Sequence, residues 1–309
     1  MIPVKYKRLV KEGYQDCRDF GLKLGTARMR CILEDESIAS VQAKNAAILE
    51  KLHKDYAHLL SRYMDQAETT TPGENAPIWM LWWDGKMPPI IELCYRSKLK
   101  NAGSHPVILL TKDNVRDYVA FPSQVWEQFR RGKLRIAHLA DMIRVQLIRR
   151  YGGLWLDASI YCSQEIPEAV FELPVYSIKG DTNPAYISDG RWTTFAIGGW
   201  QNNILCSFLD DFFQKYVAAG NRFLDYYMFD CAIALAYQKI PAVGAAIDNL
   251  PKAEGDIYWL NQHLELPPEP DYEKALPCFS KISWQRIGTP EDYPGSLYAA
   301  LMKEVPNDA

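Results

Sequence analysis

The residues best suited to chemistry lie in the run YGGLWLDAS, residues 151–159. Asp157 directly follows a short apolar run with the character of a buried strand. Gly152 and Gly153 break the preceding helix, so the carboxylate emerges where the strand stops. A carboxylate in that place meets a cation or a hydroxyl group. Two positions further, Ser159 adds an uncharged and weaker oxygen ligand.

Another charged pair precedes this run. Asp141 and Arg144 are three residues apart in a predicted helix, so they share one face. An ordinary helical ion pair is the simplest interpretation. Such a pair contributes only about 0.2 to 0.5 kcal/mol when exposed, so stability is a weak reason to place it beside a strand that ends in an acid.

The elements that must position these residues include a predicted β-α-β unit. Strands are predicted at 77–83 and 105–111, with a helix at 88–103 that starts with proline and ends with glycine. A right-handed crossover makes the strands parallel, and open α/β sheets bind ligands at the carboxyl edge that such strands share. A helix at 135–150 then leads into the strand before Asp157. We expect the loops after all three strands to converge, as a nucleotide site requires.

Helical sequence flanks this unit. Residues 35–67 lack glycine and proline and repeat apolar residues every three or four positions, which predicts one long helix. The linker TTTPGENAP follows, giving a helical region at 1–72 and an α/β domain at 73–309. The apolar seam of the helix packs on its own domain or, alternatively, forms a homodimer. The proline-rich segment 241–309 predicts short strands at most.

Composition restricts the class of protein. The chain has 309 residues, 48% of them hydrophobic, which is typical of a globular protein with a proper core. A formal net charge of −3 argues against general nucleic-acid binding. The seven cysteines form no C-x-x-C pair, so neither a disulfide framework nor a zinc knuckle is predicted. No segment has the apolar length of a signal peptide core or a membrane span, which predicts a cytoplasmic protein.

One segment is strongly basic. Between positions 130 and 150, Asp141 is the only acid among seven basic residues, which are Arg130, Arg131, Lys133, Arg135, Arg144, Arg149 and Arg150. A solvated helix face is the common interpretation of such a run. The alternative is a surface for phosphates, of a nucleotide or of lipid headgroups. The segment, or the N-terminal helix, is thus a candidate for peripheral contact with the inner face of the membrane.

The order of the motifs resembles the capsular polysaccharide synthesis glycosyltransferases. They are similar to the DXD-type sugar transferases, glycosyltransferase family 32-like proteins with a GT-A (Rossmann-like) α/β fold. The resemblance rests on D-x-x-R and D-x-S with the intervening Tyr-Gly-Gly, on PIWMLWWDGKMPP and LLTKDN, and on FSKISWQ at 279–285. It covers about residues 76–287 and leaves the N-terminal helical appendage outside the shared motifs.

The resemblance implies a nucleotide-sugar donor over the carboxyl edge of the sheet. The implied donor contacts are Trp82, Trp83, Asp84, Gly85, Thr111, Asn114, Asp141, Arg144, Asp157 and Trp284. Asp157 matches the first acid of DXD, and Ser159 replaces the second. The resemblance also implies a divalent cation, Mn²⁺ or Mg²⁺, bound between Asp157, Ser159 and the diphosphate of the donor. For Trp284 the alternative is a buried core residue.

The closing motif departs from the family pattern. Ser280 stands where relatives often have histidine, so a metal-binding histidine is missing there. Lys281 is a candidate to neutralise the diphosphate directly, and an ordinary surface lysine is the alternative. Asp157 and Lys281 are therefore the predicted catalytic residues.

Acceptor contacts are predicted in the less regular sequence that follows. Trp192 and Trp200 are candidates because sugar rings stack on aromatic faces, and Asp230 is a candidate base or sugar contact. The alternatives are buried core tryptophans and a helix-capping or loop acid.

The function implied is transfer of one hexose from a UDP-hexose, such as UDP-galactose or UDP-glucose, to a lipid-linked oligosaccharide in bacterial capsule or surface polysaccharide synthesis. Retention of the anomeric configuration is expected by analogy. Two other functions stay open: a non-catalytic nucleotide-sugar or glycan-binding protein, and an assembly subunit whose long helix recruits partner enzymes.

Overall fold

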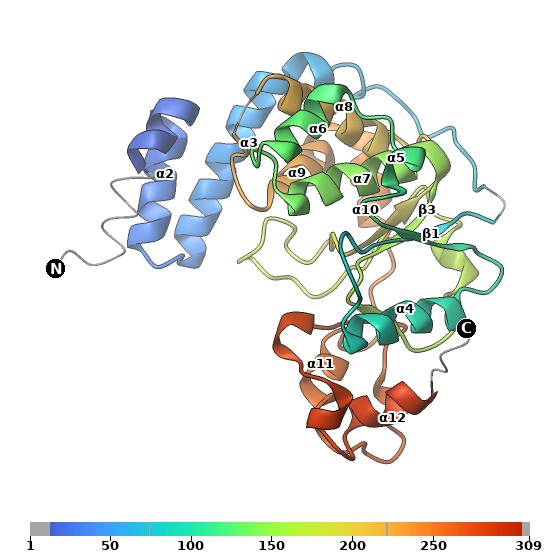
Figure 1. Ribbon diagram of the computed structural model, residues 1–309. Helices are drawn as coiled ribbons and strands as arrows, with labels where there is room; N and C mark the ends of the chain where they lie inside the picture. Colours follow the sequence, from blue (N-terminus) through green and yellow to red (C-terminus); the bar gives the residue numbers. More distant parts are fainter. Residues whose placement is uncertain (1–12, 74, 221, 305–309) are drawn as a thin grey trace.

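A mixed β-sheet lies at the centre of the molecule, with helices on both of its faces (Figure 1). The computed structural model describes residues 13–73, 75–220 and 222–304. The sheet has five strands in the order β2-β1-β3-β6-β5, and β4 and β7 form a separate two-stranded sheet. The strands are β1 (Ile78–Leu81), β2 (Val107–Leu110), β3 (Gly153–Leu156), β4 (Ile160–Cys162), β5 (Val175–Ser177), β6 (Ala196–Gly199) and β7 (Phe279–Lys281).

The α-helices form two groups. Most of them share one apolar core on one face of the sheet, and α4, α11 and α12 pack together on the other side. The helices include α2 (Leu22–Leu33), α3 (Ile38–Leu60), α4 (Pro89–Asn101), α5 (Val115–Tyr118), α6 (Ser123–Arg130), α7 (Ile136–Tyr151), α8 (Ile204–Ala218), α9 (Met228–Lys239), α10 (Pro241–Asp248), α11 (Trp259–His263) and α12 (Leu297–Glu304). No helix of the described ranges is long and apolar enough to cross a lipid bilayer.

The first three strands confirm the predicted parallel unit. Ile78 of β1 lies opposite Val107 of β2 and Leu154 of β3, and both pairings are parallel. The connecting helix α4 begins with proline at its first turn, where a missing N–H costs no intrahelical hydrogen bond. Asp157 directly follows β3 and therefore lies at the carboxyl edge shared by these strands. The predicted α/β class, with the parallel strands expected of a GT-A (Rossmann-like) domain, is confirmed.

The sheet continues with strands that the sequence pattern does not predict. β6 lies antiparallel to β3, with Gly199 opposite Gly153, and β5 lies antiparallel to β6. Both strands are very short, and β6 ends in Gly198 and Gly199, which have no side chains to form an alternating pattern. Contacts with distant parts of the chain cause β5 and β6 to pair, and such contacts leave no pattern in the local sequence.

The long N-terminal helix is shorter than predicted. Asp35 and Glu36 have φ angles of 49° and 58°, so the helix cannot begin before Ser37, whose side chain accepts a hydrogen bond from the Ser40 amide. The backbone leaves helical geometry at Tyr56, with φ −118° and ψ 18°, and the helix ends at Leu60. The predicted single helix over 35–67 is therefore wrong at both ends.

The apolar seam of α3 packs within the chain. Ile48, Leu52 and Leu59 are buried there, and the Tyr63 ring beyond the helix end meets the Phe208 ring of α8 edge-on at 5.7 Å. The seam therefore packs against its own chain, and the homodimer stays a prediction. The predicted division between residues 72 and 73 falls in the segment that joins α3 to β1.

The C-terminal segment is more ordered than its proline content suggests. The prediction of short strands at most is wrong, because α10, α11 and α12 form there and bury apolar residues. The strand β7 of this segment pairs antiparallel with β4 and places Lys281 opposite Ile160. Through that pairing, the closing motif at 279–285 lies beside the loop that follows Asp157.

Gly153 lets β3 approach β1, and we predict that Gly153→Ala disrupts the sheet. The residue has φ 97°, and an added Cβ would lie 2.1 Å from the Pro77 carbonyl oxygen. Backbone cannot move aside as a flexible side chain can, so a loss of roughly 3 kcal/mol or more in unfolding free energy is expected.

Gly295→Ala is the matched control for this prediction. Gly295 has φ 80° but nothing within 4 Å of an added Cβ, so a cost of only about 1 kcal/mol is expected there. Urea unfolding of the two variants measures both values. Equal losses would show that the close approach to Pro77 is unimportant.

Candidate active site

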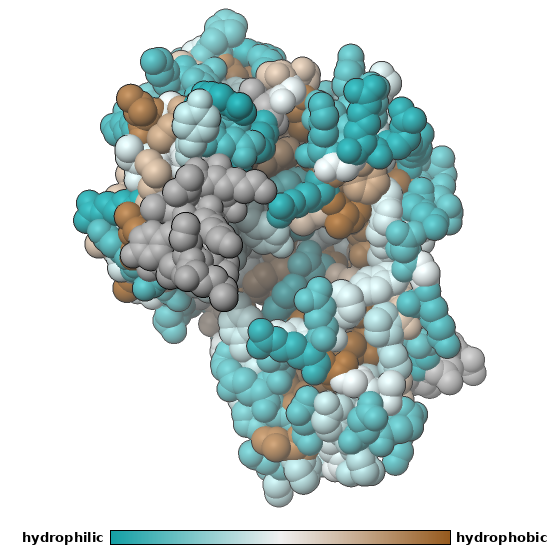
Figure 2. All heavy atoms as spheres, turned by 60° about the vertical axis from the view of Figure 1, so that its left-hand side comes forward, coloured by the Kyte–Doolittle hydropathy of each residue, from teal (hydrophilic) through white to brown (hydrophobic). Residues whose placement is uncertain are grey.

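A cavity of about 500 Å³ opens at the carboxyl edge of the parallel strands. That volume lies in the range of small-molecule sites. Figure 2 shows the surface hollowed between the larger helical part and the smaller part that contains α4, α11 and α12. The wall residues come from β1, α7, β3 and the loop after it, the segment before β6, α9 and the segment before it, and β7 with the turn after it. They include Trp82, Asp141, Arg144, Asp157, Ser159, Thr194, Tyr226, Asp230, Lys281 and Trp284.

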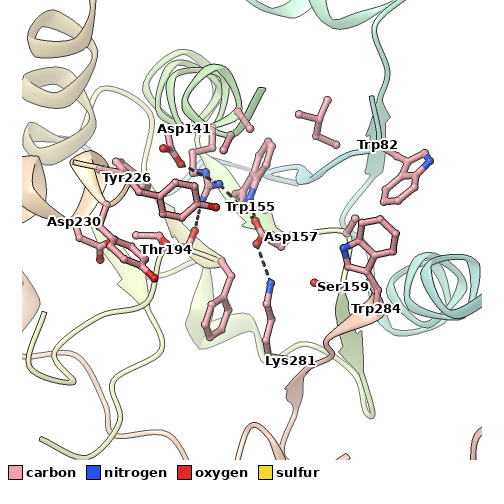
Figure 3. Close-up of a pocket in the computed structure, with 18 residues that line it drawn as sticks. Trp82, Asp141, Trp155, Asp157, Ser159, Thr194, Tyr226, Asp230, Lys281 and Trp284 are labelled. Carbon is pink, nitrogen blue, oxygen red and sulfur yellow. Dashed lines mark hydrogen bonds and ion pairs between the residues drawn. The ribbon is translucent and has the colours of Figure 1, made fainter. Parts of the chain in front are cut away.

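Asp157 lines the cavity and is held by two hydrogen bonds and an ion pair with Arg144 (Figure 3). Its Oδ2 accepts a hydrogen bond from Lys281 Nζ at 2.9 Å, and its Oδ1 accepts one from Trp155 Nε1 at 2.9 Å. Arg144 Nη2 lies 3.6 Å from Oδ1. Burial tends to raise the pKa of Asp157, but Lys281, Arg144 and the Trp155 indole outweigh it, so this pKa lies below its ordinary value. Asp157 is therefore a carboxylate at neutral pH.

Arg144 lies between Asp141 and Asp157 and pairs with both. Its guanidinium lies 3.2 Å from Asp141 Oδ1 and also donates to the Thr194 carbonyl oxygen. The rings of Trp155 and Phe229 lie 5.0 and 5.3 Å from its central carbon, within cation–π range. With 8% of its side chain exposed, Arg144 is fixed in place before any ligand arrives. The predicted Asp141–Arg144 pair thus belongs to the same site as Asp157.

A buried lysine that sequence reasoning missed holds the loop that follows β3. Lys98 of α4 is fully buried, and its ammonium donates to the Cys94, Ala158 and Ile160 carbonyl oxygens. Burial lowers the pKa of Lys98. Two of these carbonyls flank Ser159, so Lys98 fixes the loop that carries Asp157 and Ser159. Its sequence neighbourhood is an ordinary amphipathic helix and gives no signal of this role.

Two tryptophans form one wall of the cavity. The rings of Trp82 and Trp284 meet edge-on with centroids 5.3 Å apart. Trp82 Nε1 is buried and has no hydrogen-bond partner among the described residues. The aromatic faces of this pair suit a nucleobase or a sugar ring. Of the three tryptophans predicted to contact the donor, the structure brings Trp82 and Trp284 to the cavity.

Tyrosines and a carboxyl group form the opposite wall (Figure 3). Tyr226 and Tyr227 contact each other edge-on at 5.1 Å between ring centroids, and more than half of each residue is exposed. Beside them, Asp230 Oδ1 accepts a hydrogen bond from Trp192 Nε1 at 3.0 Å. Sequence reasoning missed both tyrosines, although the YY pair before a helix could have indicated them.

Other predicted donor contacts lie outside the cavity wall. Trp83 packs on Phe129 with ring centroids 5.2 Å apart, because adjacent residues of an extended chain face opposite sides. Exposed Asp84 pairs with Lys112 at 2.7 Å, and Gly85 forms the turn beside it with φ 71°.

The loop after β2 is likewise separate from the cavity wall. Asn114 Oδ1 accepts a hydrogen bond from the Thr111 amide at 2.8 Å, and Asn114 Nδ2 donates to the Leu109 carbonyl at 3.0 Å. These hydrogen bonds fix the turn that follows β2. Neither Thr111 nor Asn114 lines the cavity.

The two predicted acceptor tryptophans do not line the cavity either. Trp192 is 3% exposed and supports Asp230 from behind. Trp200 follows β6 at the end where Gly199 pairs with Gly153, which is the opposite edge of the sheet from Asp157. Its indole donates to the Phe171 carbonyl at 3.1 Å. Of the three predicted acceptor residues, the structure brings only Asp230 to the cavity.

The divalent cation predicted at Asp157 and Ser159 finds an incomplete set of ligands. Within the described ranges, no group of three or more His, Cys, Asp and Glu side chains could hold a metal ion. Both Asp157 oxygens are already engaged, one of them by the Lys281 ammonium. Hard cations need several oxygen ligands. These side chains alone therefore do not form a divalent-cation site, and phosphate oxygens of a donor would have to supply the rest.

Asp230 is a cavity carboxyl group with a raised pKa. Burial raises its pKa to about 6, in spite of the hydrogen bond from Trp192. The folded protein thus binds this proton more tightly than the unfolded chain, and its stability falls as the pH rises from 3.8 to about 6. The raised pKa corresponds to a cost of at most about 3 kcal/mol at neutral pH.

We therefore predict that Asp230→Asn stabilises the protein at neutral pH by up to about 3 kcal/mol. The amide oxygen can still accept the Trp192 hydrogen bond, so the variant removes the charge and keeps the contact. Urea unfolding at about pH 7.5 and about pH 4 measures the difference, which should nearly vanish at the lower pH. A gain of equal size at both values would contradict the raised pKa.

Comparison with known proteins identifies a family for this chain. A sequence model of the family described as "Capsular polysaccharide synthesis protein" matches residues 30–276. No curated protein sequence matches the chain. Among solved structures, the chain is similar to one titled "PaToxG Glycosyltransferase", with a TM-score of 0.43 and 12% sequence identity. That alignment covers 66% of this chain and 82% of the other.

Proposed function

This chain belongs to the capsular polysaccharide synthesis protein family, and we propose that it is a glycosyltransferase that uses a nucleotide sugar. The donor we propose is a UDP-hexose, such as UDP-galactose or UDP-glucose, and the acceptor is a lipid-linked oligosaccharide. Retention of the anomeric configuration is part of the proposal by analogy with DXD-type transferases.

One observation carries the proposal: two cations meet one carboxylate at the ligand edge of the sheet. Lys281 and Arg144 both lie near Asp157, and the aromatic pair Trp82–Trp284 stands beside them. The cations suit a diphosphate, the carboxylate and Asp141 suit sugar or ribose hydroxyls, and the tryptophans suit a base or ring. These are the chemical groups that a nucleotide sugar presents.

The reaction that follows is a substitution at the anomeric carbon. The bond between sugar C1 and the diphosphate oxygen breaks, and its electron pair leaves with UDP. For retention, the acceptor hydroxyl bonds to C1 on the face that the diphosphate leaves, and its proton passes to the departing diphosphate oxygen. Negative charge thus grows on the diphosphate, where Lys281 is placed to stabilise it. Because Asp157 already holds Lys281 at 2.9 Å, this ammonium needs little reorganisation when the donor binds.

Isothermal titration with UDP, in the presence of Mn²⁺ and then of a chelator, tests the donor site. We expect binding that persists with chelator, because Lys281 and Arg144 supply positive charge. Binding that requires Mn²⁺ would instead support the metal prediction at Asp157 and Ser159. Transfer from a panel of UDP-hexoses to a water-soluble oligosaccharide, with the product anomer determined by NMR coupling, tests the rest. Binding without any transfer would favour the non-catalytic alternative.

A further inference from the structure

The basic segment predicted from the sequence separates into buried and exposed parts. Arg144 belongs to the active site, and Arg149 pairs with Asp210 and Asp211 of α8, each at 2.8 Å. Arg150 donates to the Tyr118 carbonyl oxygen. The exposed remainder is the turn between α6 and α7, which we call the basic turn: Arg130, Arg131, Lys133 and Arg135.

Positive charge on the basic turn is largely uncompensated. Arg131 pairs with Glu127 at 2.6 Å. Within residues 13–73, 75–220 and 222–304, no acid forms an ion pair with Arg130, Lys133 or Arg135. Arg135 stands at the N-cap of α7, and the first turn of that helix contains no acidic residue. A cation at a helix N-terminus opposes the helix dipole, so helix stability does not explain its presence.

The basic turn lies at the rim of the active-site cavity. It leads directly into α7, and Ala137, Ala140 and Asp141 of that helix line the cavity. On the same rim, the Tyr226 ring lies 6.1 Å from the His138 ring, between centroids.

Exposed apolar side chains lie at the same rim. Ile136 is 42% exposed, Tyr226 59% and Tyr227 53%. Arginine, lysine and tyrosine next to exposed aliphatic residues are the composition of surfaces that rest on a membrane interface. Each Lys or Arg near an anionic leaflet is attracted to it. Because the chain as a whole has a formal charge of −3, its attraction to an anionic leaflet has to come from a local cluster of cations such as the basic turn.

We propose that the basic turn, with Ile136, Tyr226 and Tyr227, docks on an anionic membrane surface and turns the cavity mouth toward it. The proposal rests on the proposed function, because a lipid-linked acceptor is anchored in that surface. Docking would bring the acceptor within reach of the site without any membrane-spanning segment.

Sedimentation with vesicles tests this docking. The variant carries Arg130→Gln, Lys133→Gln and Arg135→Gln; the matched control carries Lys54→Gln, Lys100→Gln and Lys303→Gln, which remove as many exposed cations from α3, α4 and α12. Vesicles of phosphatidylcholine with phosphatidylglycerol are compared with phosphatidylcholine alone. We expect the variant to bind the anionic vesicles roughly 100-fold more weakly than wild type, and the control to bind almost as wild type does.

Transfer to a water-soluble acceptor, measured without vesicles, separates the two proposals. The basic-turn variant should keep this activity, because none of its three residues touches the cavity. Equal vesicle binding by variant and control would overturn the docking surface while leaving the transferase intact. A variant that loses soluble transfer but binds the anionic vesicles as wild type does would show that the turn binds the acceptor glycan, which also overturns it. Wild-type protein that binds vesicles but transfers nothing would overturn the proposed function alone.

Discussion

Lys281→Ala is expected to lower kcat/KM for the donor about 100- to 1,000-fold, with the fold retained. The ammonium lies 2.9 Å from Asp157 at the place where we propose the diphosphate develops charge. Removal of one preorganised electrostatic stabiliser typically costs this much. Lys281 also belongs to β7, whose backbone pairing with β4 does not depend on the side chain. Steady-state kinetics with the UDP-sugar, together with UDP titration, measures the loss.

Three further variants give this prediction its controls. Lys281→Arg keeps the charge and should recover part of the activity, whereas Lys281→Met should resemble the alanine variant. Lys274 is an exposed lysine of the same C-terminal segment, paired with Asp271, and Lys274→Ala should leave transfer unchanged. Full activity in Lys281→Ala would show that the lysine is only a structural partner of Asp157.

Arg144→Gln is expected to abolish transfer and also to destabilise the protein, by roughly 3 to 5 kcal/mol. Arg144 lies between Asp141 at 3.2 Å and Asp157 at 3.6 Å, and 8% of its side chain is exposed. Removal of the guanidinium leaves the partly buried Asp141 carboxylate without its cation and takes away one of the two cations near Asp157. Arg144→Lys should not rescue the site, because an ammonium cannot reproduce the planar contacts to Asp141, the Thr194 carbonyl and the flanking rings.

The double variant Arg144→Gln with Asp141→Asn separates stability from catalysis. Because the second substitution removes the unpaired carboxylate, we expect it to restore much of the unfolding free energy measured in urea and none of the transfer. Recovery of both would indicate that Arg144 acts only through stability. A single Arg144→Gln variant as stable as wild type would contradict the electrostatic argument.

The sequence and the structure agree best where local pattern dictates geometry. Parallel pairing of β1, β2 and β3 follows from two short apolar runs around a helix, and it places Asp157 at the ligand edge. Agreement is weaker for the loops: Trp83, Thr111 and Asn114 follow the right strands but contribute to packing and to the end of β2. A position near a sheet edge does not determine which way a side chain points.

Contacts between distant segments decide the rest of the site. Lys281 is 124 residues from Asp157 in the chain, and only the pairing of β7 with β4 brings them together. Trp192 and Trp200 have the composition of a glycan site, yet their indoles donate to internal acceptors, and Tyr226 and Tyr227 occupy the rim instead.

By itself, therefore, the sequence determined the α/β class, the β-α-β unit and the acid after the glycine turn, because apolar periodicity, glycine and proline act over a few residues. Only the tertiary structure decided which charges meet. It set the ammonium of Lys281 against Asp157, placed the buried Lys98 beneath the loop, and left the basic turn exposed at the cavity rim. Burial and ion pairing depend on segments far apart in the chain, and no local pattern encodes them.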